Sequence, residues 1–178
     1  TIGLPVLYIL GRIISASAGV GAVAILYAVT RRSGSGVGLA RLAALMLAIS
    51  PLAVEHSHLL TTDMTATMLA TACLLVSMQA DRGGRSQWTK AGALGGLAAG
   101  IKYNAGLVVV VLPLLAAWKW VAGGKQADRA RGPRGEILRS LALAGLAAIA
   151  AFLLTTPFAL IDFSRFVKDL GYEFNRVG

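Results

Sequence analysis

The sequence predicts an all-helical integral membrane protein, and three observations lead to that fold class. Hydrophobic residues make up 56% of the 178 residues, only 14% are charged, and the mean hydropathy is +0.70. Six apolar runs approach the roughly 20 residues that a helix needs to cross a bilayer core about 30 Å thick. No run alternates polar and apolar residues as the strands of a membrane barrel do.

The N-terminal half contains three predicted spans, which are Ile9–Val29, Val37–Val54 and Thr62–Ala80. Ser50-Pro51 lies near the end of the second span. Proline lacks a backbone donor and clashes with the preceding helical turn, so we expect that helix to end or kink there.

The fourth run, Trp88–Ile101, is shorter than a full span. We expect it to pair with Asn104–Val121 as a hairpin whose tip, Lys102-Tyr103-Asn104, lies below the membrane surface. The sixth run is Ile137–Pro157. About six transmembrane or half-spanning helices therefore form a single membrane domain over residues 1–178.

Small residues predict one close helix contact within this domain. Gly92, Gly96 and Gly100 recur at four-residue spacing, so they share one helix face and allow another helix to approach closely. We expect Gly95 and Ala99 to widen the same groove.

The C-terminal segment Asp162–Phe174 predicts an amphipathic helix. Its apolar side chains recur at helical spacing, at Phe163, Phe166, Val167, Leu170 and Phe174. Such a helix lies at a membrane interface, and we expect this one on the outer surface.

The distribution of basic residues predicts the orientation, because Lys and Arg accumulate in cytoplasmic loops. Twelve of the 17 fall in or beside the segments 31–41, 81–90 and 119–139, and all three Trp residues lie at the same ends of their helices. Segments 55–63 and 158–178 are therefore predicted to face outward. The net charge of +9 is then explained by topology and the lipid bilayer, and no nucleic-acid partner is expected.

The outward segment 55–63 is the first candidate site, because it places four ionisable side chains between long apolar runs. These are Glu55, His56, His58 and Asp63. A continuous helix would point Asp63 about 140° away from His58, so a common centre for these two requires a break between them. Asp63 could also cap the helix that follows it. Asp63, His58 and Glu55 are the candidate ligands of a divalent cation, Mg²⁺ or Mn²⁺, although no recognised ligand spacing is present.

Lys102 is the second candidate. An ammonium group at the tip of a short hairpin is costly near a membrane unless it snorkels or meets an anion. Tyr103 and Asn104 add a hydroxyl and an amide beside it, and with His58 they form the candidate phosphate-binding set.

The order of several short motifs resembles that of polytopic GT-C glycosyltransferases, especially bacterial members related to protein O-mannosyltransferases and aminoarabinose transferases. The resemblance covers essentially the whole chain. The motifs are Arg12-x-x-Ser-Ala, Tyr27 before Arg31-Arg32, Leu47-Ala-x-Ser-Pro51, Ser57-His58 with Thr62-Asp63, Gly96-Leu-Ala-Ala-Gly-x-Lys-Tyr-Asn104 and Pro157-Phe-x-x-x-Asp162.

This resemblance implies a GT-C-like, multi-pass enzyme of the cell (inner or plasma) membrane. It would transfer a hexose or pentose from a polyprenyl-phosphate carrier to a lipid, glycan or protein acceptor outside the cytoplasm. Asp63 and His58 would match a position that holds a cation or the donor phosphate. Lys102 would match a basic group that faces the carrier phosphate.

The usual catalytic carboxylate of such families lies in a first outer loop. The chain starts with Thr and its first acidic residue is Glu55, so we expect that loop upstream of Thr1 and regard the chain as a fragment incomplete at both ends. Two other classes stay open: a transporter or flippase with a discontinuous pathway, and a non-catalytic membrane scaffold. The first lacks a visible inverted repeat, and the second leaves the Glu-His-His-Asp cluster unexplained.

Cysteine accessibility labelling tests the predicted orientation. In a Cys73→Ser background, a cysteine replacing Asp128 should not react with a membrane-impermeant reagent added from outside, whereas one replacing Leu60 should react. Labelling of position 128 from outside would contradict both the topology and the outward placement of the site.

Overall fold

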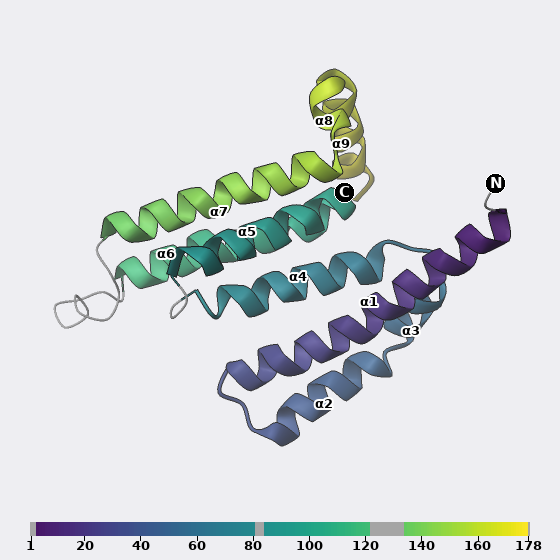
Figure 1. Cartoon of the computed structure of the whole chain (residues 1–178), viewed down its shortest axis with the longest axis horizontal. Coiled ribbons are helices and arrows are strands. Elements are labelled where there is room, and N and C mark those ends of the chain that lie inside the picture. Colours follow the sequence, from purple (N-terminus) through teal and green to yellow (C-terminus); the bar gives the residue numbers. More distant parts are fainter. Residues whose placement is uncertain (1–2, 81–83, 122–133, 178) are drawn as a thin grey trace.

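A computed structural model describes residues 3–80, 84–121 and 134–177, and this part of the chain is helical without any strand. Figure 1 shows the helices lying roughly along one direction, with the C-terminal segment turned away from them. They are α1 (Leu4–Arg32), α2 (Val37–Ala48), α3 (Pro51–His58), α4 (Asp63–Ser77), α5 (Gly84–Ile101), the 3-10 helix η1 (Tyr103–Val110), α6 (Val111–Val121), α7 (Arg134–Thr155), α8 (Phe158–Ile161) and α9 (Phe163–Val177).

The all-helical membrane fold predicted from the sequence is confirmed. Among the described residues, three helical segments are long and apolar enough to cross a membrane: Pro5–Arg32, Tyr103–Val121 and Gly135–Thr155. The pair α2 and α3 passes the same test as one bent span, and α4 is a shorter apolar helix of 15 residues. Parts of two predicted cytoplasmic loops, residues 81–83 and 122–133, lie outside the described residues.

The kink predicted at Ser50-Pro51 is also confirmed. α2 ends at Ala48, Ser50 is extended, and Pro51 begins α3 at a bend of 55°. Proline at the first helical position is favourable because the missing N–H has no partner there anyway. The bend carries the chain away from α2 toward the start of α4.

The fourth helix is longer than its apolar run, but among the described residues it is not one of the segments apolar enough to cross a membrane. α5 begins at Gly84 and has 18 residues, because its polar first turn is helical although it carries no hydropathy signal. At 1.5 Å per residue it is about 27 Å long, close to the thickness of a bilayer core. Lys102 therefore follows the end of a nearly full-length helix.

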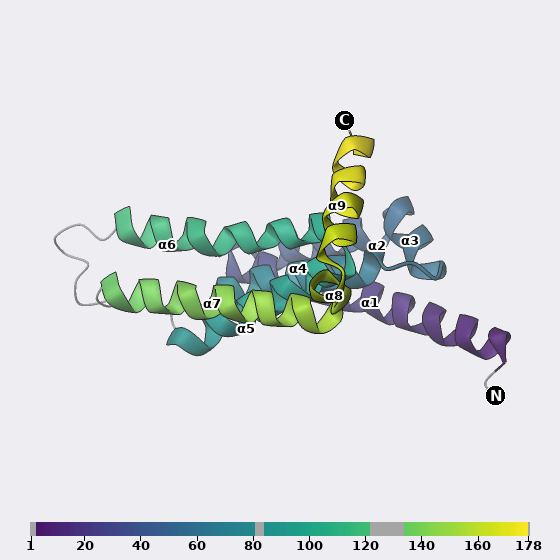
Figure 2. The ribbon, with the colours of Figure 1, turned by 90° about the horizontal axis from the view of Figure 1, so that it is seen from above.

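α5 and α7 pack closely, as the Gly92, Gly96 and Gly100 repeat predicts. The two helices run in the same direction side by side (Figures 1 and 2). A Cβ atom at Gly92 or Gly96 would overlap the backbone of Ala144 or Ala148 on α7. Gly95 does not belong to this face as expected, because a Cβ there would meet Val109 of η1 and the Cys73 sulfur of α4 instead.

Two buried clusters hold the helices together. The larger one is centred on Cys73, Trp88, Leu112 and Ala144, and so joins α4, α5, α6 and α7. The smaller one joins α1 to α4 through Ala18, Ala22 and Met64. Cys73 is a buried free thiol, as expected.

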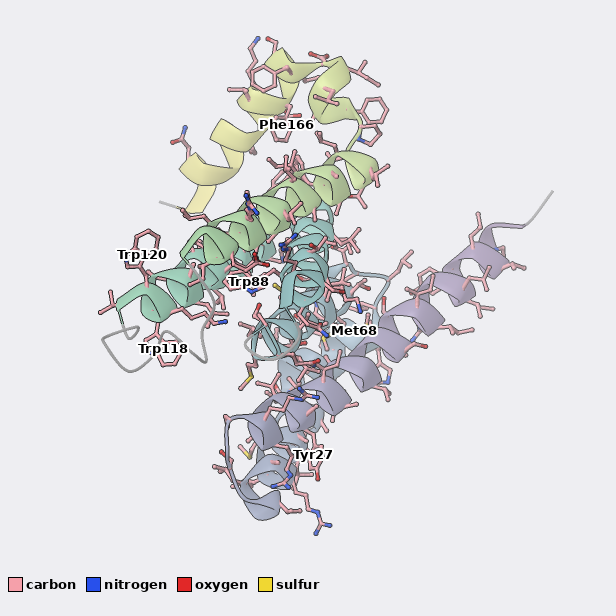
Figure 3. The ribbon with its side chains drawn as sticks, turned by 60° about the vertical axis from the view of Figure 1, so that its left-hand side comes forward. Tyr27, Met68, Trp88, Trp118, Trp120 and Phe166 are labelled. Carbon is pink, nitrogen blue, oxygen red and sulfur yellow. The ribbon has the colours of Figure 1, made fainter. Side chains whose placement is uncertain are left out.

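The three tryptophans differ in their surroundings more than the sequence suggested. Trp118 and Trp120 are exposed at the end of α6 that Figure 3 shows far from Phe166. Trp88 is only 3% exposed, and the Nζ atom of the buried Lys119 lies 5.6 Å from its ring centroid. Only Trp118 and Trp120 therefore have the exposure expected of interfacial aromatics.

The amphipathic C-terminal helix is present as α9, and it stands across the direction of α7 (Figure 2). Asp162 caps it, since Oδ1 accepts a hydrogen bond of 3.1 Å from the Arg165 backbone N–H. Its Phe166 ring packs edge-on against Tyr103 and Phe152, at centroid distances of 5.9 and 6.1 Å. α9 therefore contacts the tip that follows α5.

The packing of α5 on α7 predicts a strong position effect for glycine substitutions. Gly96→Ala should lower the free energy of unfolding by about 1–3 kcal/mol, because the new Cβ forces two backbones apart. Gly145→Ala on α7 is the matched control: its Cβ meets nothing within 4 Å, and it should be neutral or stabilise by about 0.5–1 kcal/mol. Thermal unfolding in detergent measures both. Equal effects of the two variants would contradict the packing.

Candidate functional site

The two candidate regions of the sequence form one site. Lys102 follows α5 in an extended conformation, and Asp63 is the first residue of α4. α4 and α5 are antiparallel neighbours, so the start of one lies beside the end of the other (Figure 1). There the Lys102 Nζ atom donates a hydrogen bond to Asp63 Oδ1 and forms an ion pair with it. We call this end of the helices the site end.

The break that a histidine–aspartate contact requires is also present. α3 ends at His58, Leu59 is extended, and Thr62 precedes α4. The sequence suggested His58 as the histidine beside Asp63, but the break brings His56 there instead. The His56 Nδ1 atom lies 3.5 Å from Asp63 Oδ2. The two carboxylate oxygens therefore face different partners, an ammonium group and an imidazole.

His58 has its own partners, and among the described residues it forms no hydrogen bond or ion pair with Asp63. Its Nδ1 lies 2.8 Å from the Val54 carbonyl oxygen one turn earlier in α3. Its own carbonyl oxygen accepts a 2.8 Å hydrogen bond from Arg12 Nε of α1. A cation at the C-terminal end of α3 is favourable because the last carbonyl groups of a helix are partly negative and unpaired.

The site is half-exposed, and its charges modify one another. The Asp63 and Lys102 side chains are 30% and 45% exposed. The hydrogen bond from Lys102 lowers the pKa of Asp63 below its usual value, against the opposing effect of burial. Asp63 is thus ionised at neutral pH and is a weak proton acceptor, which suits a group that holds a cation better than a general base.

Tyr103, Asn104 and Glu55 lie around this pair in different ways. Tyr103 is 40% exposed and contacts Phe166 of α9. Asn104 is exposed in η1, and its side chain makes no hydrogen bond to any part of the chain that the structure describes. Glu55 is exposed on α3, and no ion pair forms between it and another described residue.

The expected divalent-cation site is not assembled by these residues. In the described ranges 3–80, 84–121 and 134–177, no three His, Cys, Asp or Glu side chains are grouped to hold a metal ion. Asp63 supplies the carboxylate of the Lys102–Asp63 ion pair, and the Lys102 ammonium group already balances its negative charge. An ammonium group beside Oδ1 opposes a second cation there, so these residues alone do not fit Mg²⁺ or Mn²⁺.

Sequence reasoning named His56, Arg12 and Ser15 but assigned none of them a binding or supporting role in the site. Ser15 is 2% exposed and donates a 3.1 Å hydrogen bond to the Thr61 carbonyl oxygen, so α1 holds the linker between α3 and α4. Arg12 and Ser15 carried a usable signal, since both are polar residues in the apolar first span. His56 stands out only as one of the four ionisable side chains of segment 55–63, because the direction of the break is not encoded by spacing.

Comparison with known proteins assigns a family to most of the chain. The family model described as dolichyl-phosphate-mannose-protein mannosyltransferase matches residues 9–126, about two thirds of the sequence. That range includes most of α1 and all of α2 to α6, and therefore Asp63, Lys102 and His56. Neither a curated protein nor a solved structure matches the chain. The family match favours the glycosyltransferase interpretation over the transporter and scaffold alternatives.

The exposure of the ion pair predicts that its removal leaves the protein folded. Asp63→Asn and Lys102→Met should each lower the free energy of unfolding by less than about 1 kcal/mol, as partly solvated pairs do. Thermal unfolding of the purified variants measures this. A loss of several kcal/mol would show that the pair holds the fold together and is not poised for a ligand.

Proposed function

This chain belongs to the dolichyl-phosphate-mannose-protein mannosyltransferase family, and on that premise we propose that the protein transfers a sugar from a polyprenyl-phosphate carrier to a lipid, glycan or protein acceptor on the extracytoplasmic side. The family comprises membrane glycosyltransferases that use such carriers as sugar donors. The observation that carries the proposal is the Lys102–Asp63 pair at the site end.

Lys102 is the group that we assign to the carrier phosphate. An ammonium group has three N–H donors, and Asp63 takes one of them. The remaining donors belong to a side chain that is 45% exposed, so an anion can reach them. Asn104 is exposed two residues away and supplies an additional amide, while Tyr103 forms the wall toward α9.

The same arrangement suits the chemistry of sugar transfer. When the bond between the sugar and the phosphate breaks, negative charge develops on the departing phosphate. A cation held beforehand by Asp63 stabilises that charge without first having to be ordered. Asp63 is thus a supporting residue, and the base that activates the acceptor is a different group.

The membrane setting explains the position of the site. The isoprenoid tail of the carrier requires apolar surroundings, whereas its phosphate requires polar ones. At the site end, apolar helices meet the polar side chains of the α3–α4 linker. The exposed apolar residues of α8 and α9, such as Phe158, Ile161 and Phe163, adjoin the same end and suit a membrane interface.

Lys102→Met should weaken binding of the polyprenyl-phosphate carrier by about 10- to 150-fold, since a hydrogen bond to a charged group contributes roughly 1.5–3 kcal/mol. Titration of purified full-length protein with the carrier measures the Kd. Lys90→Met is the matched control, because Lys90 is an exposed lysine near the other end of α5. A Kd of the Lys102→Met protein within about threefold of wild type would reject the phosphate role.

Asp63→Asn should abolish most of the transferase activity of the full-length protein while its thermal stability stays close to wild type. Asparagine keeps the shape and is also favourable at a helix start, but it removes the charge that holds Lys102. Sugar transfer from the carrier to an acceptor is the assay. Normal activity would mean that Asp63 is only structural.

A further inference from the structure

His56 lies where it can fix the orientation of the Asp63 carboxylate. Its Nδ1 atom is 3.5 Å from Asp63 Oδ2, on the side of the carboxylate opposite Lys102. Both side chains are partly buried, with 28% and 30% of their surfaces exposed. Asp63 therefore has a neighbour at each carboxylate oxygen: Lys102 donates a hydrogen bond to Oδ1, and the imidazole lies beside Oδ2.

His56 is itself held by a chain of hydrogen bonds that starts in α1. The Ser15 hydroxyl donates to the Thr61 carbonyl oxygen, and the Thr61 hydroxyl donates to the His56 carbonyl oxygen at 3.2 Å. Thr61 Oγ1 also lies 3.4 Å from His56 Nδ1. The imidazole is thus fixed at the break between α3 and α4 and is connected to the packed part of α1.

We propose that His56 is a positioning residue of the donor site: it fixes the Asp63 carboxylate so that Asp63 presents Lys102 to the phosphate of the carrier. This inference rests on the proposed function. An N–H group at Oδ2 keeps that oxygen from competing for a second Lys102 donor. Two of the three Lys102 donors then stay available to the phosphate.

His58 provides an internal comparison. It lies two residues from His56 on the same short helix, but its ring is paired with the Val54 carbonyl oxygen, and the ion pairs of Asp63 among the described residues are with His56 and Lys102. Loss of the His58 ring should therefore leave the Lys102–Asp63 pair unchanged.

Substitutions of equal shape test the role of His56 in the full-length protein. His56→Leu removes the donor, whereas His56→Asn keeps a side-chain N–H close to the position of Nδ1 and has nearly the shape of leucine. We expect His56→Leu to weaken polyprenyl-phosphate binding about 10-fold and His56→Asn to restore most of that loss. Lys90→Met, at an exposed lysine near the other end of α5, should bind like wild type, and thermal unfolding checks that all variants are folded.

Two results would overturn the role of His56. Unchanged carrier affinity of the His56→Leu protein would show that the histidine does not position the pair. Equal losses for His56→Leu and His56→Asn would show that the N–H donor is not what matters. Lys102→Met in the same series separates the two proposals. If Lys102→Met does not weaken carrier binding, the phosphate role of Lys102 is rejected. If Lys102→Met weakens binding but His56→Leu does not, only the positioning role of His56 is rejected.

Discussion

The ion pair between Lys102 and Asp63 is the contact on which the candidate site depends. Charged side chains near the ends of membrane helices are costly unless they reach water or a partner. Here two opposite charges from helices α4 and α5 meet at the same end, so each satisfies the other. The pair is nevertheless 30–45% exposed. A fully buried pair would serve only the fold, whereas an accessible one can exchange part of its contacts for those of an anion.

The packing of the helices determines where this pair lies. Gly92 and Gly96 bring α5 and α7 into backbone contact, and buried Cys73 packs between α4 and α5. These contacts fix the position of α5 along its own axis relative to α4 and α7. They therefore fix the position of Lys102, which follows α5. On the other side of α4, Ser15 holds the linker that contains Thr61. Both charged residues are therefore placed by the interior of the helical domain and not by flexible loops.

Much of the fold could be predicted because its causes are local. Apolar runs indicate spans, Ser50-Pro51 indicates a bend, and the four-residue glycine repeat indicates a close helix contact. The length of α5 could not be predicted from hydropathy, because its first turn contains Arg85 and other polar residues that are helical all the same. Trp88 also looked interfacial from its place in the sequence, but it is buried by α6 and its neighbours.

The sequence indicates Asp63 and Lys102 as separate candidates, but it does not indicate that they form a pair. Asp63 and Lys102 were both candidates, and their 39-residue separation hid the contact. The sequence nevertheless contains the information needed to predict the pair. The start of one helix and the end of the next antiparallel helix lie on the same side of the helical domain, so opposite charges at these two positions can meet. The choice of His56 over His58 was not encoded in the same way. It depends on the backbone of the four linker residues 59–62, whose conformation no spacing rule predicts.

The central claim is that Asp63 acts on the carrier through Lys102. A double-mutant cycle of carrier affinity tests it most directly, with Kd measured for wild type, Asp63→Asn, Lys102→Met and the double variant in the full-length protein. The account predicts strong coupling, so that the double variant binds about as weakly as Lys102→Met alone. Independent effects, in which the two losses of affinity multiply, would contradict it.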